Sequence, residues 1–195
     1  MKKLFLTFDD GPDPFYTPRL LDLLAKYQIK ATFFVLGERA QQYPHIVQQI
    51  ALQHEIGHHT WDHTSPLKLS DYDACYSVDR ATQYLEDLLG RSLKLWRPPF
   101  GHINKVMVSH CQTLQQKMIL WDQSAIDWGL LGVTPLIKRR LRKAYRRSDT
   151  PQGQVVLLHD TKNRQNQPER SYTALAQFLR ESAQSSSVEF NSVDV

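Results

Sequence analysis

Short apolar runs alternate with stretches of helical periodicity along almost the whole chain. The first run, LFLTF at residues 4–8, is apolar at nearly every position, which is typical of a strand buried on both faces. Similar runs follow at 31–35, 55–59, 93–96, 118–121 and 155–158, with a weaker one at 188–193. Helical patterns begin between them, near Thr17, Pro44, Ser70, Asn104, Thr134 and Tyr172. This alternation predicts an α/β fold of about seven parallel strands, in a single domain that covers residues 1–195.

One of these helices carries signals at both of its ends. Ser70 suits the N-cap, with Asp73 in the capping-box position, and Gly90 suits the residue just past the last turn. The segment 183–188 is rich in serine and is the only stretch between the elements with the composition of a loose loop. We therefore expect no linker and no second domain.

Polar side chains that are capable of chemistry collect directly after the predicted strands. They are Asp9 and Asp10, the histidines of 59–63, Arg97, the segment 122–127 and His159. If the strands are parallel and the sheet is closed or nearly closed, these groups meet at one end, where α/β folds build active sites. Neighbouring side chains of an extended backbone point to opposite faces, so we expect Asp9 and Asp10 to have different roles. The alternative is an ordinary strand-ending turn, because Asp, Gly and Pro are common in turns.

The segment HTWDH at 59–63 holds two histidines four residues apart. In a helical backbone His59 and His63 would lie on one face and could share a metal, and an aspartate from elsewhere would complete a two-histidine, one-carboxylate set. His54 and His58 have the same spacing, but residues 55–57 interrupt that helix, so we favour the later pair. Eight histidines often produce such a spacing by chance, and the pair alone does not establish a metal site.

Three other positions are ambiguous when each is taken alone. Arg97 precedes two prolines, which stiffen the loop and could hold a backbone N–H ready for an oxyanion, although a rigid structural corner would have the same sequence. His159 suits a general acid or base, because the free pKa of histidine lies near neutrality, but a strand-end histidine is often structural. Trp128, after Asp127, is typical of packing.

Together, five segments occur in an order and at distances that resemble the NodB-type polysaccharide deacetylases, carbohydrate esterase family 4. They are TFDDGP at 7–12, HTWDH at 59–63, RPPFG at 97–101, DW at 127–128 and LLHD at 157–160. The resemblance extends from residue 4 to about residue 193 and implies a distorted (β/α) barrel with about seven strands. It implies a hydrolase that removes N-acetyl groups from a sugar polymer, oligomer or glycoconjugate of the chitin-oligomer or peptidoglycan type.

The resemblance also implies a metal centre and a base. A divalent metal, usually zinc and sometimes cobalt or nickel, would be bound by Asp10, His59 and His63. Asp9 would be the general base, and Arg97 would hold and orient it. Such a metal can lower the pKa of its water to about 7, so that Asp9 can accept a proton as water attacks the acetamide carbon.

The remaining groups would serve the oxyanion, the leaving amine and the acetyl methyl. The backbone N–H of Phe100 would help to form the oxyanion hole; tyrosine is commoner there, but a backbone donor tolerates phenylalanine. His159 would be the general acid, and Asp127 would raise its pKa and keep it charged. Leu158 and Trp128 would wall the acetyl pocket.

Two other readings of the same residues stay open. A relative could hydrolyse another amide or a cyclic imide at the same metal site, or the chain could be a non-catalytic carbohydrate-binding relative. All five segments keep their chemical groups, which argues against a silent protein. His58 stands where the family often has asparagine, and could offer a wrong metal ligand.

The charge of the chain is mildly positive, at +4, and is concentrated in one place. The segment KRRLRKAYRR at 138–147 holds seven basic residues in ten. A solvated outer helix explains it, and so does a patch for an anionic polymer or membrane surface. No recognised nucleic-acid motif accompanies it, so we expect no nucleic-acid partner.

Composition excludes several other classes of protein. Cys75 and Cys111 do not form a disulfide framework, and no segment is long and apolar enough to span a membrane. The apolar run after Lys2 and Lys3 is too short for the core of a signal peptide. We therefore expect a cytoplasmic protein from the chain as given, and an extracytoplasmic one if a leading segment precedes it.

Overall fold

The computed structural model describes residues 2–163, 166–182 and 188–193 of the chain. Its strands are β1 (Lys2–Asp9), β2 (Thr32–Val35), β3 (Glu55–His58), β4 (Leu95–Trp96), β5 (Lys117–Met118), β6 (Gln123–Ser124), β7 (Gln154–His159) and β8 (Val188–Phe190). They form one sheet in the order β5-β4-β3-β2-β1-β7-β6, and β8 pairs with β1 off this path. Every strand pair among the described residues is parallel. The predicted α/β fold with about seven parallel strands is confirmed.

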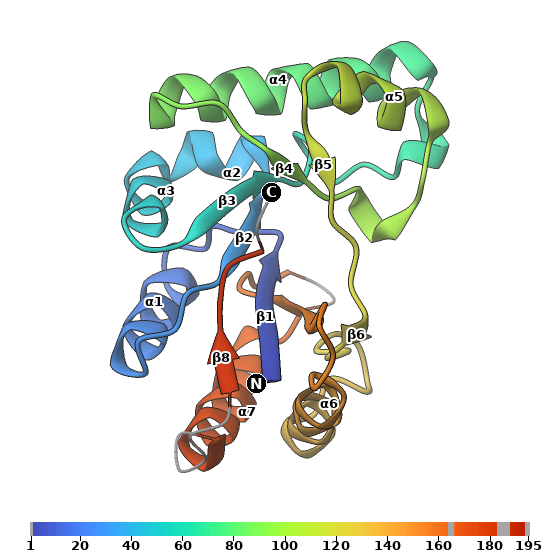
Figure 1. The fold of residues 1–195 in the computed structure, drawn as a ribbon. Helices are drawn as coiled ribbons and strands as arrows, with labels where there is room; N and C mark the ends of the chain where they lie inside the picture. Colours follow the sequence, from blue (N-terminus) through green and yellow to red (C-terminus); the bar gives the residue numbers. More distant parts are fainter. Residues whose placement is uncertain (1, 164–165, 183–187, 194–195) are drawn as a thin grey trace.

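The helices are α1 (Tyr16–Lys26), α2 (Gly37–Gln42), α3 (Pro44–Ala51), α4 (Asp71–Leu89), α5 (Lys105–Thr113), α6 (Thr134–Arg147) and α7 (Pro168–Ser182), with short 3₁₀ turns at Pro66–Lys68 and Pro99–Gly101. Figure 1 shows them around the outside of the curled sheet, with β1 near its centre. The predicted ends of α4 are confirmed, because Ser70 accepts a hydrogen bond from the Asp73 N–H and Gly90 has φ +65°. No helix of the described residues is long and apolar enough to cross a membrane.

The two faces of strand β1 are both buried, and they pack against different parts of the molecule. Leu4, Leu6 and Phe8 are almost fully buried and belong to the main core between sheet and helices. Burying each such side chain contributes about 1.5–3 kcal/mol. Thr7 is also buried, and its hydroxyl accepts a hydrogen bond from Arg97 on the inner side of the sheet. The outer side of β1 therefore packs in the main core, and its inner side places Thr7 within hydrogen-bond reach of Arg97.

The curled sheet is open between its two end strands, since β5 and β6 do not pair with each other among the described residues. Arg97 lies at this opening. Its Nε donates to the Ile119 carbonyl at 2.8 Å and its Nη2 to the Leu120 carbonyl at 3.2 Å, both in the connection between β5 and β6. The arginine thus satisfies backbone carbonyls that a closed barrel would pair with a neighbouring strand.

The structure differs from the sequence-based prediction in three short elements. The strand predicted at 118–121 is the two-residue β5 (Lys117–Met118), and neither β6 nor α2 was predicted. Elements of two to six residues carry too little periodicity to be recognised, and β6 exists because it pairs with β7. The loose segment predicted at 183–188 lies, for 183–187, outside the described residues.

Candidate active site

A cavity of about 470 Å³ lies at the carboxyl ends of the strands. Its polar lining consists of Asp9, Asp10, His59, His63, His159, Asn163 and Asn166, and its apolar lining of Phe100, Trp121, Trp128 and Leu157. Most of the residues singled out in the sequence therefore meet in one place. Arg97 and Asp127 lie behind this surface, fully buried.

Asp9 and Asp10 do not point to opposite sides, as the extended-strand argument predicted. Asp10 has φ +72°, in the left-handed region, so the backbone turns directly after β1 and both carboxylates line the cavity. The next residue must be glycine, because a Cβ at Gly11 would lie 2.4 Å from Oδ1 of the buried Asp160. The expected opposite directions of Asp9 and Asp10 were therefore wrong, because the turn after β1 brings both acids into one site.

Asp9 is held by the buried guanidinium of Arg97. Arg97 Nη1 lies 2.7 Å from Asp9 Oδ1 and 2.8 Å from Thr7 Oγ1. Burial raises the pKa of Asp9 to about 6, although the Arg97 charge opposes this rise. The carboxylate is therefore fixed in direction, and its pKa lies close to neutral pH.

Asp10, His59 and His63 form a cluster whose ligand atoms all lie within 4.8 Å of one another. Asp10 Oδ1 is 3.6 Å from His59 Nε2 and 3.2 Å from His63 Nε2. This buried oxygen has no hydrogen-bond partner among the described residues, and a metal would supply one. Asp10 Oδ2 is held by Asn166 Nδ2 at 2.8 Å, leaving Oδ1 turned toward the histidines. The cluster fits a divalent cation bound by two imidazoles and a carboxylate.

The two histidines of the cluster are not on a helix, contrary to the backbone considered for their spacing. Thr60 has φ +65° and His63 has φ +61°, and this turn brings the two imidazole centroids to 5.0 Å. His59 Nδ1 lies 2.7 Å from the Arg97 carbonyl, so this nitrogen donates and Nε2 is left as a lone-pair ligand. Burial lowers the pKa of His59 to about 4, which keeps the ring neutral and suited to a metal.

The competing histidine pair lies outside the cavity. His54 Nδ1 accepts from the Ala31 N–H at 3.2 Å, and His58 Nε2 lies 3.0 Å from Gln116 Oε1. His58 is also stacked on Trp96, with ring centroids 6.1 Å apart. Both side chains support the fold, and His58 is turned away from the cluster.

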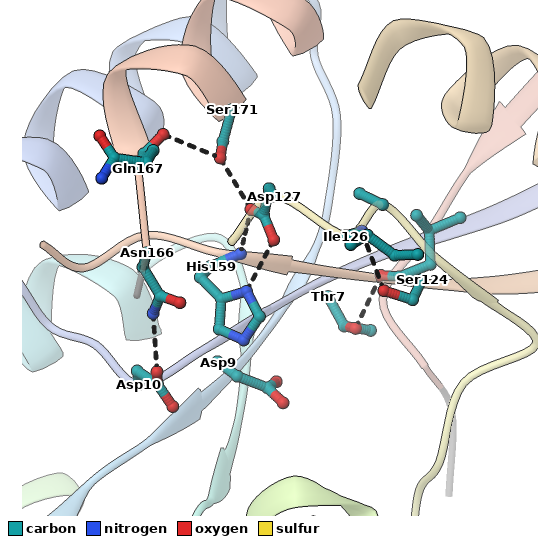
Figure 2. A network of polar contacts seen from close by, with 12 residues as sticks. Thr7, Asp9, Asp10, Ser124, Ile126, Asp127, His159, Asn166, Gln167 and Ser171 are labelled. Carbon is teal, nitrogen blue, oxygen red and sulfur yellow. Dashed lines mark hydrogen bonds and ion pairs between the residues drawn. The ribbon is translucent and has the colours of Figure 1, made fainter. Parts of the chain in front are cut away.

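His159 forms a second polar unit together with Asp127, as Figure 2 shows. Asp127 Oδ1 lies 2.7 Å from His159 Nδ1, while Oδ2 accepts from the His159 N–H and from Ser171 Oγ. Burial disfavours the charged imidazole, but the Asp127 carboxylate outweighs it and raises the pKa of His159 to about 9. His159 therefore carries a proton at neutral pH, on the cavity side of Asp127.

Phe100 contributes its backbone and its ring in different ways. Its φ of +59° turns the 3₁₀ segment Pro99–Gly101 sharply, and its N–H has no hydrogen-bond partner among the described residues. The ring is half exposed and contacts His63, with centroids 4.4 Å apart. The backbone donor is thus free for a ligand beside the histidine cluster.

The apolar wall differs from the prediction by one residue. Leu157 lines the cavity, whereas Leu158 is fully buried in the main core on the other side of β7. Alternation along a strand makes this a difference of face, and Trp128 does lie at the wall, with its ring 5.2 Å from that of His159. Trp121, Asn163 and Asn166 were not predicted. Trp121 is the last residue of the strand predicted at 118–121, while the two asparagines lie in a loop without a recognisable signal.

Comparison with known proteins places these residues in context. The family model described as polysaccharide deacetylase matches residues 1–119. A peptidoglycan-N-acetylglucosamine deacetylase of Bacillus cereus is 36% identical over 183 residues, which cover 92% of this chain and 81% of the relative. The peptidoglycan-N-acetylmuramic acid deacetylase PdaC of Bacillus subtilis is 34% identical over 82% of this chain, which spans only 32% of that longer protein.

Solved structures show the same fold. The crystal structure of the Bc1960 peptidoglycan N-acetylglucosamine deacetylase superposes with a TM-score of 0.86 and 30% sequence identity. The superposition covers 98% of this chain and 86% of the other. The likeness thus includes all the strands that carry the cavity.

Proposed function

Because the chain belongs to the polysaccharide deacetylase family, we propose that it is a metal-dependent hydrolase that removes N-acetyl groups from glycans of the peptidoglycan or chitin-oligomer type. One observation supports this above all others. Asp10 Oδ1, which has no hydrogen-bond partner within the described part of the chain, faces ring nitrogens of His59 and His63. The same cavity holds the carboxylate of Asp9 and the protonated ring of His159. Metal-assisted amide hydrolysis uses this combination of a cation site, a base and an acid.

Asp10, His59 and His63 would hold the metal, and zinc suits this ligand set best. Bound there, the ion would supply Lewis acidity, which makes water more acidic and stabilises negative charge on a carbonyl oxygen. Asn166 and the Arg97 carbonyl fix the directions of Asp10 and His59 from behind. Such supporting contacts typically change metal affinity 10–100-fold when removed.

Asp9 is placed to act as the general base. Its Oδ2 lies 3.7 Å from His59 Nε2, beside the cation site, and its Oδ1 is fixed by Arg97. With a pKa of about 6 it is mostly ionised at pH 7, yet it is basic enough to accept a proton from an attacking water. Arg97 acts as a positioning residue, because the structure has it touching Asp9 rather than facing the cavity.

His159 and Phe100 would serve the two ends of the breaking amide. An amine leaves only when it is protonated, and His159 holds a proton at its cavity-side nitrogen, because Asp127 occupies the other one. The free Phe100 N–H can donate to the oxyanion, a contact worth on the order of 3 kcal/mol in the transition state. Leu157 and Trp128 provide apolar surface for a methyl group.

Acetate release from the sugars, and ring opening of the imides, by metal-loaded protein test this function. The panel comprises peptidoglycan fragments, chitin oligomers, acetylated xylan and small cyclic imides, with Asp9→Asn protein of equal metal content as the control. We expect acetate from the N-acetylated sugars and none from the variant. If only the imides are hydrolysed, the substrate is another amide or imide and not an N-acetylated sugar. If the metal-loaded protein hydrolyses nothing in the panel, it is a non-catalytic carbohydrate-binding protein.

A further inference from the structure

Helix α6 carries the positive charge of this protein. The chain has 24 Lys and Arg residues against 20 Asp and Glu, and seven of the cations lie between residues 138 and 147. Without that segment the rest of the chain would be net negative. A charge so concentrated is not needed for solubility, for which mixed and dispersed charges suffice.

Three of the seven cations have structural partners. Lys138 and Arg142 both bind Glu181 of α7, at 3.4 Å and 2.7 Å. Arg140 donates to the Ala125 carbonyl at 3.2 Å and so holds the segment that follows β6. These side chains fasten α6 to its neighbours, which accounts for part of the basic composition.

The other four cations have no such task. Arg139, Lys143, Arg146 and Arg147 are exposed and make no hydrogen bond or ion pair with any described residue. At 100° per residue they fall within about 100° of one another around the helix axis, over about 12 Å of its length. They form one exposed row, which we call the cationic row.

A second segment, far away in sequence, places one more cation at the C-terminal end of α6, beside Tyr145, which lies outside the row. Lys2 Nζ lies 4.2 Å from the ring centroid of Tyr145 on α6, and the Lys3 N–H donates to the Ser148 carbonyl at the end of the helix. Figure 1 shows the N-terminus beside α6. Asp149 is the one acidic residue within 138–150. Cations from two segments thus converge on one end of the helix.

We propose that the cationic row binds a linear phosphodiester polymer that carries no bases, for which poly(glycerol phosphate) is the probe. Three of its four members are arginines, whose planar fork binds phosphate oxygens in pairs. A single row about 12 Å long suits a linear chain of charges. This inference goes beyond the deacetylase activity and does not rest on it, since binding is measured without acetate release.

A membrane surface fits the row less well. Amphipathic helices bind membranes by inserting an apolar face, but the apolar residues of α6, Ile137, Leu141 and Ala144, are buried in the core. Leu130 is exposed, yet it precedes the opposite end of the helix from Arg147 and Lys2. Single-stranded nucleic acid is bound with aromatic side chains that stack on bases, and none is exposed on this row.

The test measures binding of three probes as a function of salt: poly(glycerol phosphate), a single-stranded DNA oligomer and phosphatidylglycerol vesicles. The row variant combines Arg139→Gln, Lys143→Gln, Arg146→Gln and Arg147→Gln. We expect it to bind the poly(glycerol phosphate) roughly tenfold or more weakly than the natural chain at low salt, with a salt slope smaller by about 3, as for four lost phosphate contacts.

The matched control removes four dispersed exposed lysines, by K26Q, K30Q, K68Q and K105Q. It has the same net charge as the row variant, and we expect it to keep most of the affinity. Equal weakening in both variants would reduce the effect to net charge and overturn the proposal. So would absent binding of poly(glycerol phosphate), or tighter binding of the DNA oligomer or of vesicles than of that polymer.

Discussion

Replacing Asp127 by asparagine should move the basic limb of the pH–activity profile by more than two pH units. Asp127 accepts three hydrogen bonds, from His159 Nδ1, the His159 N–H and Ser171 Oγ. An amide has the same shape but no charge, and only one of its two ends can accept. The substitution therefore removes the charge that keeps His159 protonated while it leaves the packing of the buried site nearly unchanged.

The magnitude follows from the titration of His159. With a pKa of about 9, roughly nine-tenths of the imidazole carries its proton at pH 8. Without the Asp127 charge, burial lowers the pKa of His159 and only the charges of Asp10 and Asp9 still oppose it. At the free histidine value of about 6.5, about 3% of the imidazole is protonated at pH 8. A reaction that needs this proton should slow about 30-fold or more at pH 8. The ratio should grow as pH rises from 6.5 towards 9 and flatten above 9.

The assay is kcat/KM for acetate release from an N-acetylated oligosaccharide between pH 5.5 and 9.5. The control is Ser171→Ala, which removes one hydrogen bond to Asp127 and keeps its charge, so its basic limb should stay near pH 9. A variant whose activity falls by the same factor at every pH would refute the reasoning, because Asp127 would then act through structure and not through the proton of His159.

Three further outcomes are expected. Arg97→Met should lower the free energy of unfolding in urea by about 3 kcal/mol, because it leaves the Asp9 carboxylate buried without its partner; a loss below 1 kcal/mol would contradict this. His59→Ala and His63→Ala should each lower the metal content measured by atomic emission, and unchanged content would place the ligands elsewhere. Asn166→Ala should weaken metal binding about 10–100-fold, measured by calorimetry. Asn166→Asp adds a negative charge beside the cation site, so its loss of metal affinity should be smaller than that of Asn166→Ala.

Much of the fold could be predicted because its main signals are local. The apolar run at 4–8 became the central strand β1, and Ser70 and Gly90 mark the ends of α4. Short elements could not be predicted, since β6 has only two residues and exists through its register with β7. Likewise, nothing local indicates that Arg97 satisfies carbonyls at the opening between β5 and β6.

The candidate site was predictable in composition more than in geometry. Residues after parallel strands had to meet at one end, and Asp10, His59 and His63 do so. The directions of these side chains depend on backbone turns with positive φ. Neither the two-residue period of a strand nor the period of a helix predicts such turns. Leu158 was predicted at the apolar wall, but Leu157 lies there. The sequence did not show which face each residue of β7 presents, and a shift of one residue in a strand exchanges the two faces.

The site concentrates backbone strain, and this explains both its geometry and its resistance to prediction. Seven non-glycine residues have positive φ among the described ones, and Asp10, Thr60, His63 and Phe100 all belong to the cavity or its turns. Such conformations cost about 1–3 kcal/mol each and persist only where the surroundings enforce them. Thr60 is enforced by bonds from its N–H to His58 and from the Gly37 N–H to its carbonyl. A β-branched residue such as Thr60 is strained in this conformation, and the turn that it makes places His59 and His63 side by side.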